Sequence, residues 1–94
     1  MAVKTLQVTQ TGSAVQFTTV PTFARWICLQ NTGGATATVG DANVTATRGI
    51  LLAATTGQLY LDPLGDVSCH YDLSQFWTIG TNTQVLSVTY DSMN

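Results

Sequence analysis

Short runs in which apolar and polar residues alternate recur along most of the chain, and each run ends in residues that favour turns. "KTLQVTQ" places Leu6 and Val8 on one face, and "AVQFTTV" repeats the pattern through Val15 and Phe17. Alternation of this kind is typical of a strand with one buried face. The turn residues recur at about the eight- to twelve-residue spacing of β-sandwiches and small barrels. The sequence therefore predicts an all-β fold.

The composition favours the same fold class. Threonine occurs seventeen times, whereas glutamate is absent and charged residues make up only 9% of the chain. Threonine and valine are β-branched and suit a pleated sheet, while glutamate, lysine and arginine commonly furnish the exposed faces of helices. A surface with so few charges is unusual for a free monomer. It favours burial of neutral surface in a larger assembly, although a small β-domain solubilised by hydroxyls and amides is the alternative.

We expect a single compact antiparallel β-sandwich or small barrel spanning residues 1–94, with about eight short strands. "TGS" predicts a first hairpin, "TNT" a closing hairpin, and residues 67–75 an irregular loop with one helical turn. Residues 1–10 are expected to form an N-terminal arm or an edge strand, and residues 91–94 a loose tail. The predicted strands are 4–10, 14–20, 24–30, 35–40, 48–53, 58–62, 76–80 and 84–90.

Several classes of partner do not fit the sequence. It has no basic run that would indicate a nucleic-acid partner and no apolar stretch of the ~18 residues that a membrane span needs. The segment "MAVKTLQVTQ" lacks the apolar region of a signal peptide. We therefore expect Cys28 and Cys69 to be free thiols, with Cys28 in the core, and we interpret "NVT" at 43–45 as strand sequence rather than a glycosylation acceptor.

The glycine-rich "NTGGATATVG" at 31–40 raises the question of a phosphate-binding loop. Such a loop needs two correctly spaced glycines followed by lysine and then serine or threonine. Here Asp41 stands where the lysine would be needed, and an aspartate repels phosphate. No dinucleotide fingerprint with a following helix is present either. We interpret the stretch as the turn of a hairpin, with its threonines on the outer face of a strand.

Catalytic and metal-binding arrangements are weak in this chain. Cys69 and His70 are adjacent, so on an extended chain they point to opposite sides and do not form a thiol–base pair. His70 is expected to be a surface residue in a loop. The nearby aspartates at 62, 66 and 72 lack the spacing of a dedicated calcium loop, which leaves only a weak cation site as an alternative. We expect no enzymatic activity, no metal and no cofactor.

Aromatic side chains are the remaining candidates for a functional surface. Alternation places Ile27 and Leu29 on one face of their strand and Trp26 with Cys28 on the other. It also pairs Trp77 with Ile79 on a buried face, so that Phe76 points away from the core. Outward aromatics on a small β-domain either pack under a loop or lie at a protein interface. The predicted interface residues are Lys4, Phe23, Trp26, Tyr71 and Phe76.

Residues 25–90 show a recurrent pattern. An apolar strand ends in asparagine, a glycine turn follows, the next strand closes on "VGD", and "GQLYLD", "LSQFWTIG" and "VLSVTY" complete the series. This pattern resembles small virion proteins of tailed bacteriophages, and most of all their capsid decoration, or cement, proteins. The motifs that carry the resemblance are strand ends and turns, which have structural roles.

The resemblance implies a β-rich, non-enzymatic structural protein, made in the host cytoplasm and located on the capsid surface of the virion. Its partners would be the major capsid protein and copies of itself, as a homo-oligomer such as a trimer. The N-terminal residues 1–10 could lie along the major capsid protein. The alternative is a β-module of a tail, neck or fibre that binds a host receptor or a carbohydrate, for which Tyr60, Tyr71 and Trp77 would have to be exposed.

Overall fold

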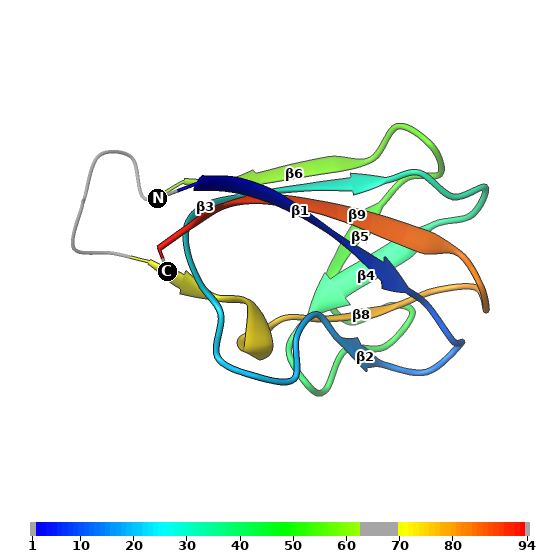
Figure 1. The fold of residues 1–94 in the computed structure, drawn as a ribbon. Coiled ribbons are helices and arrows are strands. Elements are labelled where there is room, and N and C mark those ends of the chain that lie inside the picture. Colours follow the sequence, from blue (N-terminus) through cyan, green and yellow to red (C-terminus); the bar gives the residue numbers. More distant parts are fainter. Residues whose placement is uncertain (1, 63–69, 94) are drawn as a thin grey trace.

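The computed structural model, which describes residues 2–62 and 70–93, contains two antiparallel β-sheets packed face to face (Figure 1). The prediction of an all-β sandwich is confirmed. Sheet A has the order β1-β9-β3-β6, and the short strand β7 also pairs with β3. Its strands are β1 (Ala2–Thr9), β9 (Val85–Ser92), β3 (Phe23–Asn31), β6 (Gln58–Leu61) and β7 (Tyr71–Asp72). Sheet B has the order β2-β8-β4-β5, with β2 (Val15–Gln16), β8 (Trp77–Ile79), β4 (Ala37–Gly40) and β5 (Ile50–Leu52).

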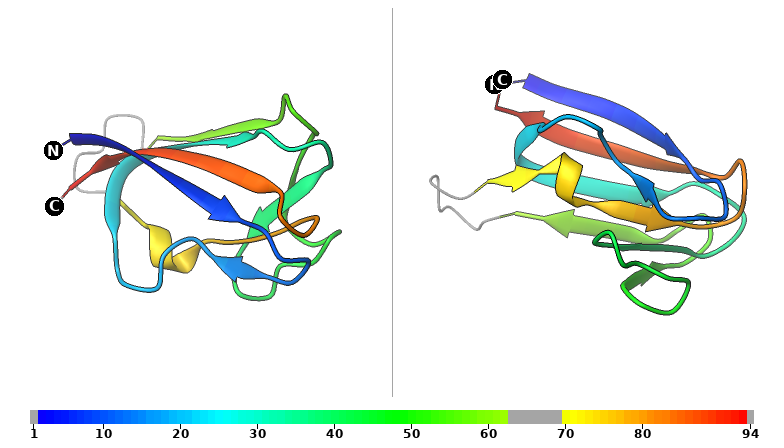
Figure 2. Two further views of the ribbon diagram at one scale, coloured as in Figure 1. Left: turned by 45° about the vertical axis from the view of Figure 1, so that its right-hand side comes forward. Right: turned by 90° about the horizontal axis from the view of Figure 1, so that it is seen from below.

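The connectivity is that of a jelly roll, the double-sheet arrangement of two Greek keys. Strands β6 and β7 pair with successive parts of β3 and together fill one strand position. The chain then passes from one sheet to the other at most connections. Four of these crossings, β1–β2, β3–β4, β5–β6 and β8–β9, lie at the end of the sandwich opposite the two termini (Figures 1 and 2).

Three predicted hairpins are therefore wrong. Strand β1 pairs with β9 along its whole length, whereas β2 pairs with β8 in the other sheet. Likewise β8 and β9 lie in different sheets, and so do β3 and β4 on either side of the "NTGG" turn. A turn signal predicts that the chain reverses direction, but it does not distinguish a hairpin from a corner between two sheets.

The core is formed mainly by the inward residues of sheet A. Ile27, Leu29, Leu86 and Val88 are fully buried, and Leu59 and Leu61 of β6 pack against them. These are the faces that alternation predicts for β3 and for β6. Sheet B adds Val39 and Leu52, and the 3-10 helix η1 (Leu73–Gln75) adds Leu73.

Sheet B departs from the predicted faces. In β8 the buried residue is Thr78, while Trp77 and Ile79 lie half-buried on the opposite face, so their predicted burial is wrong. In β4 Thr38 is buried as well, because the loop after the strand covers it and accepts a hydrogen bond from its hydroxyl at Ala46. That same loop contains residues 43–47, which form no strand.

The two ends of the chain are more ordered than predicted. Residues 2–9 form the edge strand β1, which is one of the two predicted alternatives. At the other end β9 continues to Ser92, whose side chain is buried, and the Met93 amide donates to the Phe23 carbonyl. The predicted loose tail is therefore wrong for residues 91–93.

The irregular segment before β8 is described only in part. The predicted helical turn is confirmed as η1, which follows the two-residue strand β7. His70 is exposed, as expected. Cys28 is a free thiol but is half-buried on the outer side of β3 rather than in the core. Asp66 and Cys69 lie outside the described residues.

Candidate interaction surface

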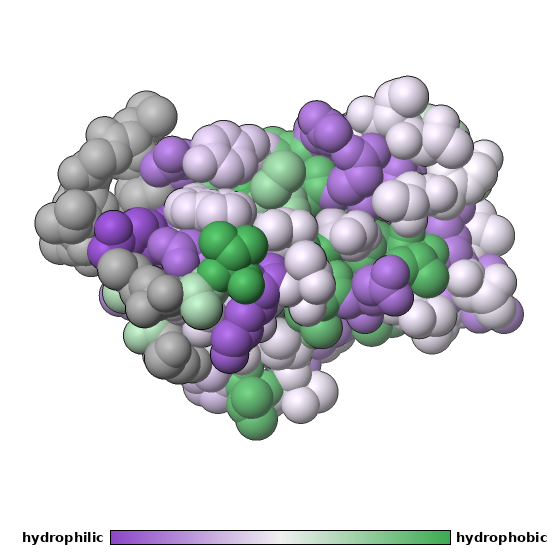
Figure 3. All heavy atoms as spheres, turned by 45° about the horizontal axis from the view of Figure 1, so that its top comes forward, coloured by the Kyte–Doolittle hydropathy of each residue, from purple (hydrophilic) through white to green (hydrophobic). Residues whose placement is uncertain are grey.

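The outer face of sheet A is a broad and nearly uncharged surface. Strand register places the residues that alternate with the core on this face, in rows that run across β1, β9, β3 and β6. Asp91 is the one charged residue that register places there, and Arg25 lies beside Trp26 in the bulge of β3 between Ala24 and Ile27. Figure 3, which brings this side of the molecule forward, shows large areas of intermediate hydropathy between smaller purple and green areas. The outer face of sheet A consists of Val3, Thr5, Gln7, Thr9, Val85, Ser87, Thr89, Asp91, Trp26, Cys28, Gln30, Gln58 and Tyr60.

Two aromatic side chains meet on this surface. The rings of Trp26 and Tyr60 lie 6.0 Å apart between centroids and are tilted by 53°. Tyr60 is 57% exposed, and its hydroxyl donates a hydrogen bond of 3.1 Å to Asp62 Oδ2. Partial desolvation of the hydroxyl, together with the bond and the charge of Asp62, raises the pKa of Tyr60. The predicted outward position of Trp26 is confirmed. Tyr60 lies next to it, so the two rings form one aromatic surface.

Two of the other predicted aromatic interface residues pack against the core. Phe76 stacks on Phe17 with a centroid separation of 5.8 Å, and Tyr71 contacts the edge of Phe76. Both pack against the core, so the expectation that Phe76 points away from it is wrong. Phe23 is half-buried at the start of β3 and makes an edge-on contact with His70. The structure thus separates Tyr71 and Phe76 from the outer face of sheet A, whereas Phe23 alternates with the buried Ala24 and lies on the outer side at the start of β3.

Lys4 lies on the edge strand β1. It is exposed and alternates in phase with Leu6 and Val8, on the core side of sheet A. An inward-pointing charge on an edge strand disfavours edge-to-edge pairing in registers that bring two such charges together. Lys4 is the only charged residue of β1.

A buried polar cluster holds the four crossings together at one end of the sandwich. We call Gln10, Asn31, Thr78 and Gln84 the polar clasp; the first three of these side chains are fully buried. Gln10 Nε2 donates to Thr78 Oγ1 at 2.9 Å, and Thr78 Oγ1 donates to the Thr38 carbonyl at 3.0 Å. Gln84 Nε2 donates to Gln10 Oε1 at 3.2 Å. Every buried side-chain nitrogen and oxygen in the described residues has a hydrogen-bond partner.

Asn31 supplies the largest share of these bonds. Its Nδ2 donates to the carbonyls of Ala35, Leu52 and Ala53 at 2.8, 3.0 and 3.1 Å, and its Oδ1 accepts from the Gly33 amide. The bonds tie the end of β3 in sheet A to the end of β5 in sheet B. From the sequence, Asn31 was noted only as the asparagine that ends an apolar strand, and no structural role was assigned to any member of the polar clasp. The available signal was a polar amide directly after or at the end of an apolar strand, as at Gln10 and Asn31.

The glycine turn at 32–35 serves this cluster. A Cβ atom at Gly33 would collide with the Gln84 side chain, which is fixed by bonds to the Ala35 amide and carbonyl at 3.0 and 2.9 Å. The glycine therefore allows a side chain from the β8–β9 crossing to lie against the backbone of the β3–β4 crossing. The glycine-rich turn therefore binds the side-chain amide of Gln84 from the same chain.

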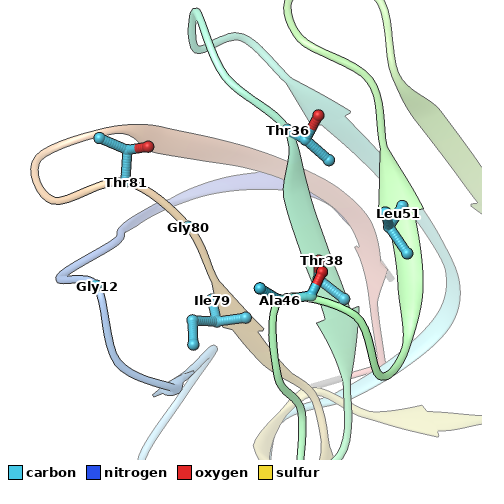
Figure 4. A pocket seen from close by; sticks show the side chains of 8 residues that line it. All are labelled: Gly12, Thr36, Thr38, Ala46, Leu51, Ile79, Gly80 and Thr81. Atoms are coloured by element: carbon cyan, nitrogen blue, oxygen red, sulfur yellow. Dashed lines mark hydrogen bonds between the residues drawn. The ribbon is translucent and has the colours of Figure 1, made fainter.

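A hollow lies on the outer side of sheet B. Its volume is about 420 Å³, and Thr36, Thr38, Leu51, Ile79 and Thr81 contribute to its lining (Figure 4). Thr38 of β4, Leu51 of β5 and Ile79 of β8 surround it, and Gly12, Ala46 and Gly80 complete the wall. The lining thus offers methyl groups, hydroxyls and peptide groups to a ligand.

A second, more apolar groove of about 290 Å³ opens between the free edges of β5 and β6. Ile50, Leu59, Leu61 and Phe76 contribute to its lining. Ile50 is 49% exposed at its rim. This side of the sandwich therefore presents aliphatic surface between the sheets.

Neither a metal-binding cluster nor a membrane-spanning helix occurs in the part of the chain that the structure describes. Among residues 2–62 and 70–93, no group of three or more histidine, cysteine or acidic side chains is arranged to hold a metal ion. The same part of the chain has no helix that is long and apolar enough to cross a membrane.

Comparison with known proteins adds no relative. No protein-family model matches the chain, and no curated protein and no solved structure shows a significant match. The jelly-roll topology is therefore established by the strand pairing of this chain alone.

Proposed function

We propose that this chain is a non-enzymatic structural protein of a bacteriophage virion, a capsid decoration protein that adheres to the outer surface of the head. In this role it binds the major capsid protein and copies of itself. The sequence pattern of residues 25–90 supports this proposal through its resemblance to such proteins. Jelly rolls occur in viral capsid domains, so the fold is compatible with the role.

The observation that carries the proposal is the nearly uncharged outer face of sheet A. Desolvation of a charged group costs several kcal/mol unless it is paired, and this face buries almost none on docking. Its threonine, serine and glutamine side chains offer hydrogen bonds, and the Trp26–Tyr60 pair offers aromatic contact area of the kind enriched at interfaces. On a symmetric particle, many copies that each bind weakly would together bind strongly through multivalency.

The test places a charge at the centre of this face. Thr89 of β9 lies opposite both Thr5 and Cys28, in the middle of sheet A. The variant Thr89→Lys should lose binding to phage heads that lack the protein, because the new ammonium would be desolvated at the contact. Thr47→Lys, in the exposed loop after β4, is the matched control and should bind as the parent does.

The functional readout is the temperature at which particles release DNA. Heads that lack the protein should release it at a lower temperature than heads that carry it, and added parental protein should restore the higher temperature. Equal release temperatures with and without the protein would contradict cementing. Equal binding of Thr89→Lys would show that the outer face of sheet A is not the adhesive surface.

The Trp26–Tyr60 pair favours a second candidate, a receptor- or carbohydrate-binding module of a tail or fibre. Tyr60 is exposed and stands beside the carboxylate of Asp62, and an aromatic ring next to polar groups suits a sugar. Tyr71, by contrast, packs against the core. Titration of cell-surface glycans against the parent and Tyr60→Ala distinguishes the two roles, since only the carbohydrate role predicts binding that the substitution abolishes.

A further inference from the structure

Strand β1 presents an open edge whose backbone groups can be assigned individually. The Gln10 amide donates to the Gln84 carbonyl at 2.8 Å, which continues the β1–β9 register. Because hydrogen-bonded pairs alternate along an antiparallel ladder, the even-numbered residues of β1 bond to β9. The amides and carbonyls of the odd-numbered residues, Val3, Thr5, Gln7 and Thr9, therefore point away from the sheet.

The other side of β9 supports this assignment. The Met93 amide donates to the Phe23 carbonyl at 3.0 Å, so the odd-numbered residues of β9 bond to β3 and the even-numbered ones to β1. The four odd-numbered residues of β1 are called outward-pointing because their backbone amides and carbonyls face the open edge. Within the described residues, no hydrogen bond reaches these groups. Figure 2 shows β1 as the outermost strand of sheet A, with its outer edge uncovered in the view from below.

The remaining edge strands are short. Strands β2, β5 and β6 have two, three and four residues, whereas β1 has eight. Short length is one of the ways in which proteins protect sheet edges, and proline is another. Strand β1 has neither a proline nor a bulge, and Lys4 is its only charge.

We propose that β1 pairs with β1 of a second copy of this chain, in antiparallel orientation about a two-fold axis, so that the two A sheets join into one. Pairing requires outward-pointing residues to face each other, so residue numbers across the interface must sum to an even number. With a sum of 12, Val3 faces Thr9 of the second copy and Thr5 faces Gln7. All four outward-pointing residues of each copy then bond through both backbone groups.

The charge pattern selects the same register. With a sum of 12, Lys4 faces Val8 of the second copy, and the two lysines are about 14 Å apart along the strands. This exceeds the Debye length of about 8 Å at physiological ionic strength. With a sum of 10 the separation along the strands halves to about 7 Å, and fewer outward-pointing groups of β1 find partners. Leu6 then marks the two-fold axis, because it faces Leu6 of the second copy.

This copy-to-copy contact concerns the isolated protein and does not depend on what the outer face of sheet A adheres to. A strand pair by itself buries less than the roughly 1,200 Å² of a standard interface. We therefore expect a reversible monomer–dimer equilibrium, measured by sedimentation equilibrium over a range of concentrations. Amide exchange of Val3, Thr5, Gln7 and Thr9 should slow as the concentration rises.

A proline at position 7 tests the hydrogen bonds directly. Gln7→Pro removes an amide that points to the open edge and leaves every bond between β1 and β9 in place, because proline is tolerated at such sites. By symmetry the dimer loses two hydrogen bonds, so association should weaken by at least about tenfold. Gln7→Ala keeps the amide and should dimerise like the parent. Undiminished association of Gln7→Pro would overturn the proposal.

Cross-linking tests the register. In a chain with both native cysteines changed to serine, Leu6→Cys should form a disulfide-linked dimer, since residues paired across a two-fold axis lie within disulfide reach. Lys4→Cys should not. A cross-link through Thr5→Cys in place of Leu6→Cys would reject the register. A monomer at all concentrations, or a trimer, would reject the pairing itself. Binding of β1 to capsid protein by a chain that stays monomeric would mean that a different protein occupies the edge.

Discussion

The two sheets of this sandwich are stabilised in different ways. Sheet A has three strands of eight or nine residues, and its inward positions are mostly aliphatic and fully buried. The strands of sheet B have two to four residues, and its buried positions include the hydroxyl side chains of Thr38 and Thr78. Apolar burial dominates in sheet A. Side-chain hydrogen bonds to backbone and to one another position the short strands of sheet B.

The comparison shows where a small domain can use polar residues in its interior. The polar clasp lies where chain crossings leave backbone carbonyls that no ladder can pair, and buried peptide groups need partners. Asn31 donates to three carbonyls at such crossings, of which those of Ala35 and Ala53 also accept from Gln84 Nε2 and the Gly57 amide. The polar residues thus occur at the end of the sandwich, while the aliphatic residues fill its middle. Substitutions in the two sheets should therefore differ in size and in kind.

The largest effect is expected for Leu29→Ala in sheet A. Leu29 is fully buried between β9 and β6, and removal of its side chain leaves a cavity. The free energy of unfolding should fall by about 4 kcal/mol, within the range of buried leucine truncations. Chemical denaturation followed by tryptophan fluorescence measures this change. Leu51→Ala, on the exposed side of β5, is the control and should stay within about 0.5 kcal/mol of the parent. Equal losses for both would contradict the comparison.

A smaller loss is expected for Asn31→Ala in the polar clasp. The substitution removes the donor to the Leu52 carbonyl and one of two donors to the carbonyls of Ala35 and Ala53, which keep their bonds from Gln84 and Gly57. An unsatisfied buried group costs about 1–3 kcal/mol, and water can reach part of the site after truncation, so we expect about 3 kcal/mol in total. Amide exchange gives the location: the amides of Thr55 and Gly57, in the β5–β6 crossing, should lose protection before those of β9. A uniform loss of protection would contradict a local role.

Thr78→Val in β8 tests whether hydrogen bonds or apolar burial stabilise sheet B. Valine has the shape of threonine and would restore the apolar alternation that a buried strand usually shows. It nevertheless removes both the acceptor of Gln10 Nε2 and the donor to the Thr38 carbonyl. The expected loss is about 1.5 kcal/mol. The same exchange at Thr5, on the outer face of β1, should change stability by less than about 0.5 kcal/mol. Stabilisation by Thr78→Val would mean that apolar burial governs sheet B as well.

The same difference explains what the sequence alone could predict. Alternation identified the buried faces of β3 and β6 because a long strand next to an aliphatic core repeats its pattern several times. In β8 it failed: with only three residues, Trp77 and Ile79 looked like the buried pair, while the actual inward residue, Thr78, is buried through its hydrogen bonds. Turn residues marked where the chain bends, but the choice between hairpin and crossing depends on contacts far apart in sequence.

The candidate site was predictable to a similar extent. Trp26 was placed outward correctly because its neighbour Ile27 is a clear core residue. Its companion Tyr60 is thirty-four positions away, and only the β3–β6 register brings the two together. Phe76 precedes a short strand whose phase was assigned incorrectly, so its predicted outward position was wrong as well.

The smallest effect concerns Asp72 of β7, whose side chain connects the β2–β3 loop to η1 at the end of the sandwich that contains the termini. Its Oδ1 accepts hydrogen bonds from the Ser74 amide at 3.0 Å and the Ser74 hydroxyl at 2.8 Å, both in η1, and from the Thr22 amide at 3.0 Å, in the β2–β3 loop. The backbone bond from Ser74 is the largest cause that lowers the pKa of Asp72, opposed in part by desolvation and supported by the bond from Thr22. A group whose pKa is lower in the folded state stabilises the fold above its unfolded pKa, and that contribution is lost as the pH falls through the folded pKa.

The melting temperature of the parent should therefore decline on acidification below about pH 4 more steeply than that of Asp72→Asn, which cannot titrate but retains an acceptor oxygen. Ser74→Ala removes the hydroxyl bond and keeps the amide bond, so its acid decline should be smaller and be complete at a higher pH than that of the parent. Calorimetric scans from neutral pH downward measure all three proteins. Parallel curves for the parent and Asp72→Asn would show that this carboxylate acts only through its geometry, and that its bonds to the β2–β3 loop and η1 carry no charge-dependent stability.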